Sequence, residues 1–179
     1  MEAKVKKWIN ILVTAFVLIM AVPAVSQAAE KAGGTLTAAG NNVAVTVTLP
    51  EGRTEAITTL RLQLRVSVGS GTMDKPAFTF DPAVKSAVRD ADIRREKDNS
   101  YTIDIILSGK KDQKIFQTNG TVKIGTVSLK PTSAAFAATV AFAGKNGAAS
   151  APTVDYVDSS GLTAITVPLA GTKPAEVKK

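Results

Sequence analysis

The sequence predicts an all-β fold, an antiparallel two-sheet β-sandwich of the jelly-roll type with about seven to nine strands. Three observations indicate this class. Apolar and polar residues alternate with a period of two over several separate segments. Turn signals such as Asn119-Gly120 and Asn146-Gly147 separate these segments. No long helical segment lies between them, so a parallel βαβ fold would lack its crossover helices.

The strands follow from this alternation. The clearest case is residues 60–68, in which five apolar residues alternate with polar ones. The segments that show the pattern are 43–49, 60–68, 101–107, 122–129, 136–142 and 162–167. Gly125 interrupts its segment and predicts a β-bulge or a close backbone approach. We expect these residues in the core: Leu60, Leu62, Leu64, Val66, Ile103, Ile105, Val127 and Phe142.

The remaining segments are assigned from their turn signals. Asp81-Pro82 places an N-cap before proline and predicts a short helical turn over 83–88, with a longer helix through Ile93 as the alternative. Gly69–Ala77 and Ser150–Gly161 are expected to be loops. Residues 29–34 and 171–179 are expected to be flexible tails that flank a sandwich at residues 35–170.

Residues 1–28 have the features of a signal peptide. Lysines precede an apolar run from Ile11 to Val25, and Ser26-Gln27-Ala28 offers small residues at a cleavage site. The run falls short of the ~20 residues that span a bilayer, so we expect cleavage after Ala28 and no membrane attachment afterwards. The alternative is an uncleaved anchor. The sequence thus predicts a secreted protein, extracellular or at the cell surface.

Composition excludes several functions. The chain has no cysteine and no histidine, which excludes Ser-His-Asp and Cys-His catalysis and removes the commonest zinc ligand. The net charge of +7 is spread along the chain and is not gathered in a basic stripe, so we expect no nucleic-acid partner. The single tryptophan is Trp8 in the signal peptide, which disfavours flat stacking of polysaccharide.

Carboxylates are the acid–base groups that remain. A glycosidase would need two of them across a cleft, and Asp90, Asp92 and Asp104 are the candidates. We interpret Asp90 and Asp92 as members of exposed ion pairs with neighbouring arginines. The sequence therefore predicts no catalytic residue and no enzyme.

One loop could hold a metal. Asp155, Asp158, Ser159 and Ser160 offer oxygen ligands of the kind that calcium prefers. We favour a solvated loop there, and hence expect no cofactor and no metal site.

The order of these segments resembles that of the cohesin-like family of bacterial sandwiches, relatives of some carbohydrate-binding modules. The matching stretches are 43–49, 57–66, 80–84 with its Asp-Pro turn, 101–107 and 119–129. The resemblance covers most of residues 35–168. It implies a cohesin-like sandwich that binds another protein, with a dockerin-like module as one possible partner, and it implies that the strands at 57–66 and 101–107 share a sheet.

A candidate partner-binding surface follows from that arrangement. If Leu62, Leu64, Ile103 and Ile105 point inward, the intervening residues share the opposite face. These residues are Arg61, Gln63, Arg65, Thr102, Asp104 and Ile106. Arginine and an apolar spot within a polar rim are typical of protein interfaces; an ordinary solvated sheet is the alternative.

Two other functions remain open. One is a carbohydrate-binding module that recognises single polysaccharide chains through Tyr101, Tyr156 and charged hydrogen-bonding groups. The other is a pilus or matrix subunit that assembles by edge-strand addition.

Overall fold

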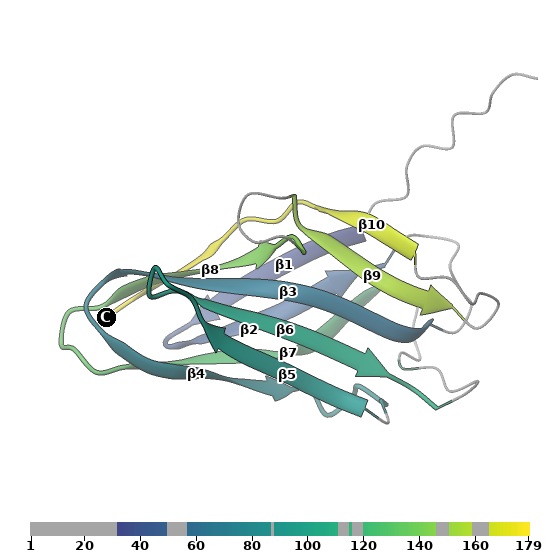
Figure 1. Cartoon of the computed structure of the whole chain (residues 1–179), viewed down its shortest axis with the longest axis horizontal. Coiled ribbons are helices and arrows are strands. Elements are labelled where there is room, and N and C mark those ends of the chain that lie inside the picture. Colours follow the sequence, from purple (N-terminus) through teal and green to yellow (C-terminus); the bar gives the residue numbers. More distant parts are fainter. Residues whose placement is uncertain are drawn as a thin grey trace, which may run out of the picture.

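The computed structural model describes residues 32–49, 57–86, 88–110, 115, 120–145, 151–158 and 165–179. In this part of the chain the regular elements are eleven strands and no helix (Figure 1). The strands are β1 (Ala32–Ala39), β2 (Asn42–Thr48), β3 (Ile57–Ser70), β4 (Met73–Phe80), β5 (Val88–Arg95), β6 (Tyr101–Ser108), β7 (Thr121–Pro131), β8 (Ala137–Ala143), β9 (Thr153–Asp158), β10 (Ile165–Ala170) and β11 (Ala175–Lys178). The predicted leader at residues 1–28 lies outside the described residues.

The strands form two sheets that pack face to face (Figure 1). Sheet A has the order β1-β2-β7-β4 and is antiparallel throughout. Sheet B is built on β3, which pairs with β6 along one edge and with β9 and then β8 along the other. β5, β10 and β11 extend sheet B, and a short parallel pairing between β1 and β10 joins the two sheets. The predicted antiparallel sandwich is confirmed, with eleven strands in the described residues where the sequence pattern indicated seven to nine.

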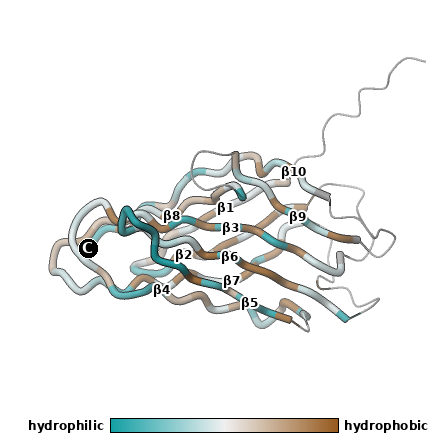
Figure 2. The backbone as a smooth tube through the Cα atoms, viewed as in Figure 1, coloured by the Kyte–Doolittle hydropathy of each residue, from teal (hydrophilic) through white to brown (hydrophobic). Residues whose placement is uncertain are grey.

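The core lies between the sheets, where the inward side chains of every strand meet. All eight predicted core residues are buried, and Leu60, Leu64, Ile103 and Ile105 are fully enclosed. The apolar and polar stretches that alternate along β3 and β6 are visible in Figure 2. Leu64 lies opposite Ile103 on β6 and opposite Phe142 on β8, so it packs at the centre of sheet B.

The predicted irregularity at Gly125 is confirmed. The register between β2 and β7 shifts next to Val45, which lies opposite Gly125, so β7 is bulged there. β4 also approaches closely: a Cβ atom at Gly125 would lie 2.4 Å from the Thr79 carbonyl oxygen and 2.6 Å from the Phe78 ring. Gly125 therefore lies both at a β-bulge and at a close backbone approach, the two features that the sequence predicted.

The predicted helical segment after Asp81-Pro82 is wrong. Asp81 caps a tight turn, in which its side chain accepts a hydrogen bond from the Ala83 amide (3.0 Å) and its carbonyl accepts one from the Val84 amide (3.1 Å). Val84 is fully buried and ends the turn, and residues 88–95, where the alternative placed a longer helix, form β5. An N-cap residue stabilises an Asx turn as readily as a helix start.

Both expected tails contain paired strands. Residues 32–34 begin β1, where Gly34 leaves room for the Phe142 ring, because a Cβ atom there would lie 2.8 Å from it. Residues 175–178 form β11 against β8, with Ala175 and Val177 buried. The expected loop at Gly69–Ala77 is largely β4, and part of the loop at Ser150–Gly161 is β9.

Three strands of the described part are paired along one edge only: β11, which pairs with β8, and the strands β4 and β5. β4 pairs only with β7, and β5 pairs only with β6; both lie on the same side of the sandwich (Figure 1). β4 carries Pro76 and a register shift between Asp74 and Ala77. On β5, Arg89 and Arg95 occupy inward-register positions and remain exposed.

Candidate functional site

The six residues predicted for partner binding lie together on the outer face of sheet B. They form three directly opposite pairs between β3 and β6: Arg61 with Ile106, Gln63 with Asp104, and Arg65 with Thr102. This placement follows from strand parity, because their neighbours Leu62, Leu64, Ile103 and Ile105 fill the core. We call the outward side chains of β5, β6 and β3 the β5-β6-β3 face.

Asp104 is the centre of this face. Its carboxylate accepts two parallel hydrogen bonds from Arg61, at 2.9 Å from Nε to Oδ1 and 2.5 Å from Nη2 to Oδ2. The Asp104 side chain is 11% exposed and that of Arg61 43% exposed. A fork of this kind holds both side chains in fixed positions, so the middle of the face is pre-organised.

The surroundings of Asp104 stabilise its ionised form. Burial on its own raises the pKa of Asp104, but the hydrogen bonds and charge of Arg61 oppose it, together with a hydrogen bond from Gln63 and the charge of Arg94. These contributions outweigh burial and hold the pKa of Asp104 below its ordinary value. The pKa of Arg61 is raised, first by its hydrogen bond with Asp104.

Asp104→Asn is expected to lower the free energy of unfolding at pH 7 by about 1 kcal/mol, because Arg61 loses its charged partner at a partly exposed site. Since the folded-state pKa of Asp104 is depressed, its contribution is present above the unfolded-state pKa and disappears as the pH falls through the folded-state value. Chemical denaturation at pH 7 and pH 2.5 measures this difference. If the difference in the free energy of unfolding between wild type and variant is equally large at both pH values, this prediction is contradicted.

A second ion pair ties the face to the β5–β6 turn. Arg65 donates to the carboxylate of Asp98, which also accepts hydrogen bonds from the amide and hydroxyl of Ser100. Those bonds to Ser100 lower the pKa of Asp98, and Arg65 adds to the effect. The contact of Asp98 with β3 depends on how distant strands pair, so the sequence pattern did not indicate it.

β5 contributes residues that sequence reasoning did not assign to the face. Asp90 lies opposite Ile106 and Asp92 opposite Asp104, and Asp92 pairs with Arg94 at 3.3 Å, as the ion-pair interpretation predicts. Val88, 53% exposed, is the most exposed large apolar side chain of the described residues. The face therefore has acidic side chains on β5 and arginines on β3, on the two sides of β6.

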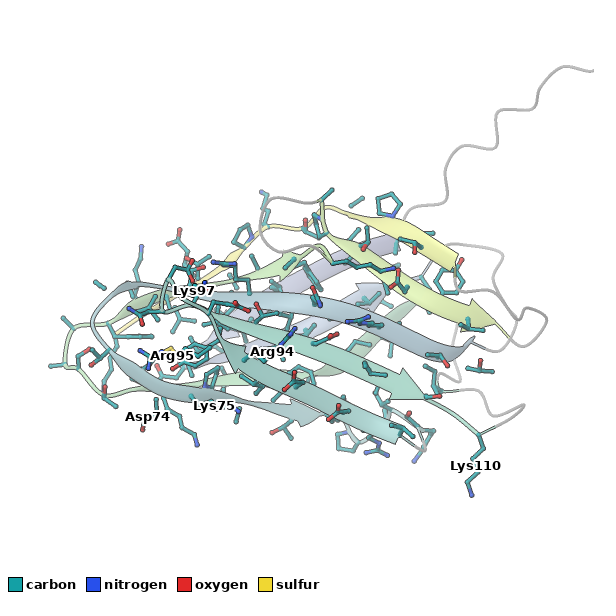
Figure 3. All side chains as sticks on the ribbon, in the orientation of Figure 1. Asp74, Lys75, Arg94, Arg95, Lys97 and Lys110 are labelled. Carbon is teal, nitrogen blue, oxygen red and sulfur yellow. The ribbon has the colours of Figure 1, made fainter. Side chains whose placement is uncertain are left out.

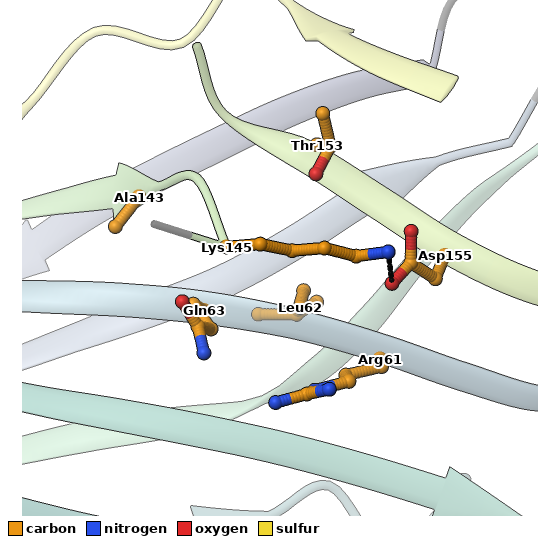
Figure 4. Close-up of a pocket in the computed structure, with 7 residues that line it drawn as sticks. All are labelled: Arg61, Leu62, Gln63, Ala143, Lys145, Thr153 and Asp155. Atoms are coloured by element: carbon orange, nitrogen blue, oxygen red, sulfur yellow. Dashed lines mark ion pairs between the residues drawn. The ribbon is translucent and has the colours of Figure 1, made fainter. Parts of the chain in front are cut away.

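Beyond Arg61 the same surface continues onto β9 (Figure 4). Asp155, opposite Arg61 in the register, pairs with Lys145 at 2.8 Å and accepts a hydrogen bond from Thr166 at 2.7 Å. A shallow pit of about 10 Å³ lies between these side chains and Gln63. The Asp155 carboxylate is thus occupied by protein partners. Of the other calcium candidates, Ser159, Ser160 and the Asp158 side chain lie outside the described residues.

The groups considered for catalysis and for sugar stacking have other surroundings. Asp104 has a lowered pKa, whereas a general acid needs a raised one. Tyr101 is 7% and Tyr156 1% exposed, so neither presents a ring face on the surface. Within the described residues no helix is long and apolar enough to cross a membrane.

Comparison with known proteins gives a fold and no sequence family. No protein-family model matches the chain, and no curated protein matches it. Two solved structures similar to it are type I cohesin–dockerin complexes from Clostridium thermocellum. The OlpC cohesin complex is 12% identical with a TM-score of 0.51, covering 86% of this chain and 98% of that one. The OlpA cohesin complex is 11% identical with a TM-score of 0.51, covering 83% and 98%. The fold is a cohesin-like β-sandwich.

Proposed function

We propose that this chain is a secreted, non-catalytic module that binds another protein at the cell surface, in a scaffolding or adhesive role. The β5-β6-β3 face is the proposed binding surface. The observation that carries the proposal is the pre-organised Arg61–Asp104 fork at its centre, with Arg65 and Ile106 beside it. The cohesins of the two similar structures are complexed with dockerins, so a dockerin-like module is the first partner to test.

The chemistry of the face suits a protein partner. Arginine is enriched at interfaces, and side chains already held in place lose little conformational entropy on binding. Half-buried Ile106 and exposed Val88 add apolar area at its β5 side. A partner that fits would carry acidic groups toward β3 and basic groups toward Asp90 and Asp92 on β5.

A polysaccharide ligand has less support. Affinity for sugar chains draws largely on stacking against aromatic faces, and Tyr101 and Tyr156, the only tyrosines of the chain, are buried. Edge-strand assembly also has less support, because β4 carries a proline and a bulge, β5 carries exposed inward arginines, and β11 has only 4 residues.

Arg65→Glu and Ile106→Glu are expected to weaken partner binding by more than about 1 kcal/mol, roughly fivefold or more in Kd, as central interface residues do. The immobilised protein is probed first with the dockerins of the two similar complexes and then with extracellular proteins of the producing organism. Biolayer interferometry then compares wild type and variants for the captured partner.

Lys173→Glu serves as the control for Arg65→Glu, because it makes the same charge change at an exposed residue outside the face. Thermal unfolding is measured in parallel, since Arg65→Glu also places an acid against Asp98. If a captured partner binds all three variants as it binds wild type, the β5-β6-β3 face is not the binding surface. If no protein is captured at all, the proposed function fails.

A further inference from the structure

A recess opens at the end of the sandwich where the β3–β4 and β5–β6 hairpins meet. Its volume is about 130 Å³, and its apolar wall consists of Val68, Met73 and Tyr101, with Arg95 and Asn99 as its polar side. Arg95 and Tyr101 are opposite each other at inward-register positions, so the recess is separate from the β5-β6-β3 face. Nothing in the proposed function uses it.

Arg95 brings an uncompensated charge to this recess. Among the described residues Arg61, Arg65 and Arg94 each form an ion pair with an aspartate, but no described carboxylate pairs with Arg95. Its Nη2 donates to the side-chain oxygen of Asn99 at 2.9 Å. A guanidinium has five N–H donors and an amide has two, so both side chains retain donors for an incoming anion.

The turn that carries these donors is well fixed. Asn99 takes a positive φ of 61°, and hydrogen bonds from the Asn99 amide to Glu96 (3.2 Å) and from the Glu96 amide to Ser100 (2.8 Å) close the hairpin. Arg94 is paired with Asp92 on the outer face and Asp98 is paired with Arg65, so Arg95 and Lys97, labelled in Figure 3, are the two basic groups left at this turn beside one carboxylate, Glu96. The rim therefore favours a negative charge.

We infer that this recess binds a carboxylate joined to a short apolar group. Arg95 and Asn99 bind the carboxylate, in the geometry for which a guanidinium is suited, and the wall of Val68, Met73 and Tyr101 covers the apolar part. This is the chemistry of a peptide's C-terminal leucine or valine and of a free branched carboxylic acid.

The test is an NMR titration of the ¹⁵N-labelled protein with N-acetyl-L-leucine. We expect saturable shifts at the amides of Gly71, Thr72, Met73 and Asn99, which surround the recess. Arg95→Gln should weaken binding at least roughly tenfold, the value of one charged hydrogen bond. Arg94→Gln removes the same charge from the neighbouring residue on the outer face and should change the affinity less than about twofold. N-acetyl-L-leucinamide, which lacks the carboxylate, should also bind at least roughly tenfold more weakly.

A second variant tests the apolar part without changing charge. Met73→Phe enlarges a half-buried wall residue and should block binding while the rest of the spectrum stays that of the folded protein. Isovalerate and an acetylated tripeptide ending in leucine distinguish the source of the ligand: equal binding of isovalerate indicates a free acid, and tighter binding of the tripeptide indicates a peptide C-terminus. Unlocalised shifts, or wild-type binding by Arg95→Gln, would overturn the inference while leaving the proposed function of the β5-β6-β3 face untouched.

Discussion

Leu64→Ala is expected to lower the free energy of unfolding by about 2–5 kcal/mol, since it removes buried methyl groups and leaves a cavity. Leu64 is fully buried, and its strand β3 is paired on both edges at this position, with Ile103 on β6 and Phe142 on β8. Because β3 is held by a neighbouring strand on each side, the residues around Leu64 have little freedom to collapse into the cavity. Urea denaturation monitored by circular dichroism measures the loss.

Ser67→Ala is the matched control on the same strand. Ser67 is exposed at an outward position of β3, and its truncation should change the stability by no more than about 0.5 kcal/mol. An unfolding midpoint for Leu64→Ala equal to that of Ser67→Ala would show that β3 is not the centre of the core.

Gly125→Ala is expected to destabilise the protein by about 1–3 kcal/mol, the range for forcing an atom into a packed site. The new Cβ atom would lie 2.4 Å from the Thr79 carbonyl oxygen and 2.6 Å from the Phe78 ring. The oxygen belongs to the backbone of β4, so the strand itself must move. Chemical denaturation of wild type and variant measures the effect.

Gly69→Ala is the control for the backbone effect of replacing a glycine. A Cβ atom at Gly69 would contact only the Ala137 carbonyl oxygen, at an ordinary 3.6 Å, and the change reduces the entropy of the unfolded chain. We therefore expect neutral or slightly raised stability. A Gly125→Ala variant as stable as Gly69→Ala would mean that β4 does not approach β7 as closely as the structure has it.

The sequence predicted those strands that bury one complete face. β3 and β6 lie inside sheet B, so apolar inward residues alternate with polar outward ones from Leu60 to Val66 and from Tyr101 to Leu107, with Ile106 as the one apolar residue at an outward position. β5 is an edge strand whose inward positions, apart from half-buried Ala91 and Ile93, are exposed arginines, and its pattern is correspondingly weak. β4 loses its period at the register shift between Asp74 and Ala77. The strand propensity and the alternating pattern of a segment reflect how completely one of its faces is buried. Edge strands bury little of their surface, so their pattern is weak.

The candidate face was predictable for a related reason. Once Leu62 and Ile103 are assigned to the core, strand parity places Arg61 and Thr102 on the opposite side. The ion-pair partners were not predictable. Asp98 lies on a turn and reaches Arg65, 33 residues away in the chain. Such contacts depend on the pairing of distant strands, which a single sequence does not encode in any local pattern.

The open edges of β4 and β5 bear on aggregation. An open strand edge is a template for fibril growth, because a second molecule can extend the sheet through its backbone groups. Here an added strand beside β5 would have to desolvate the guanidinium groups of Arg89 and Arg95, and beside β4 it would meet the missing donor of Pro76. These side chains therefore oppose association of two sandwiches through the open edges of β4 and β5.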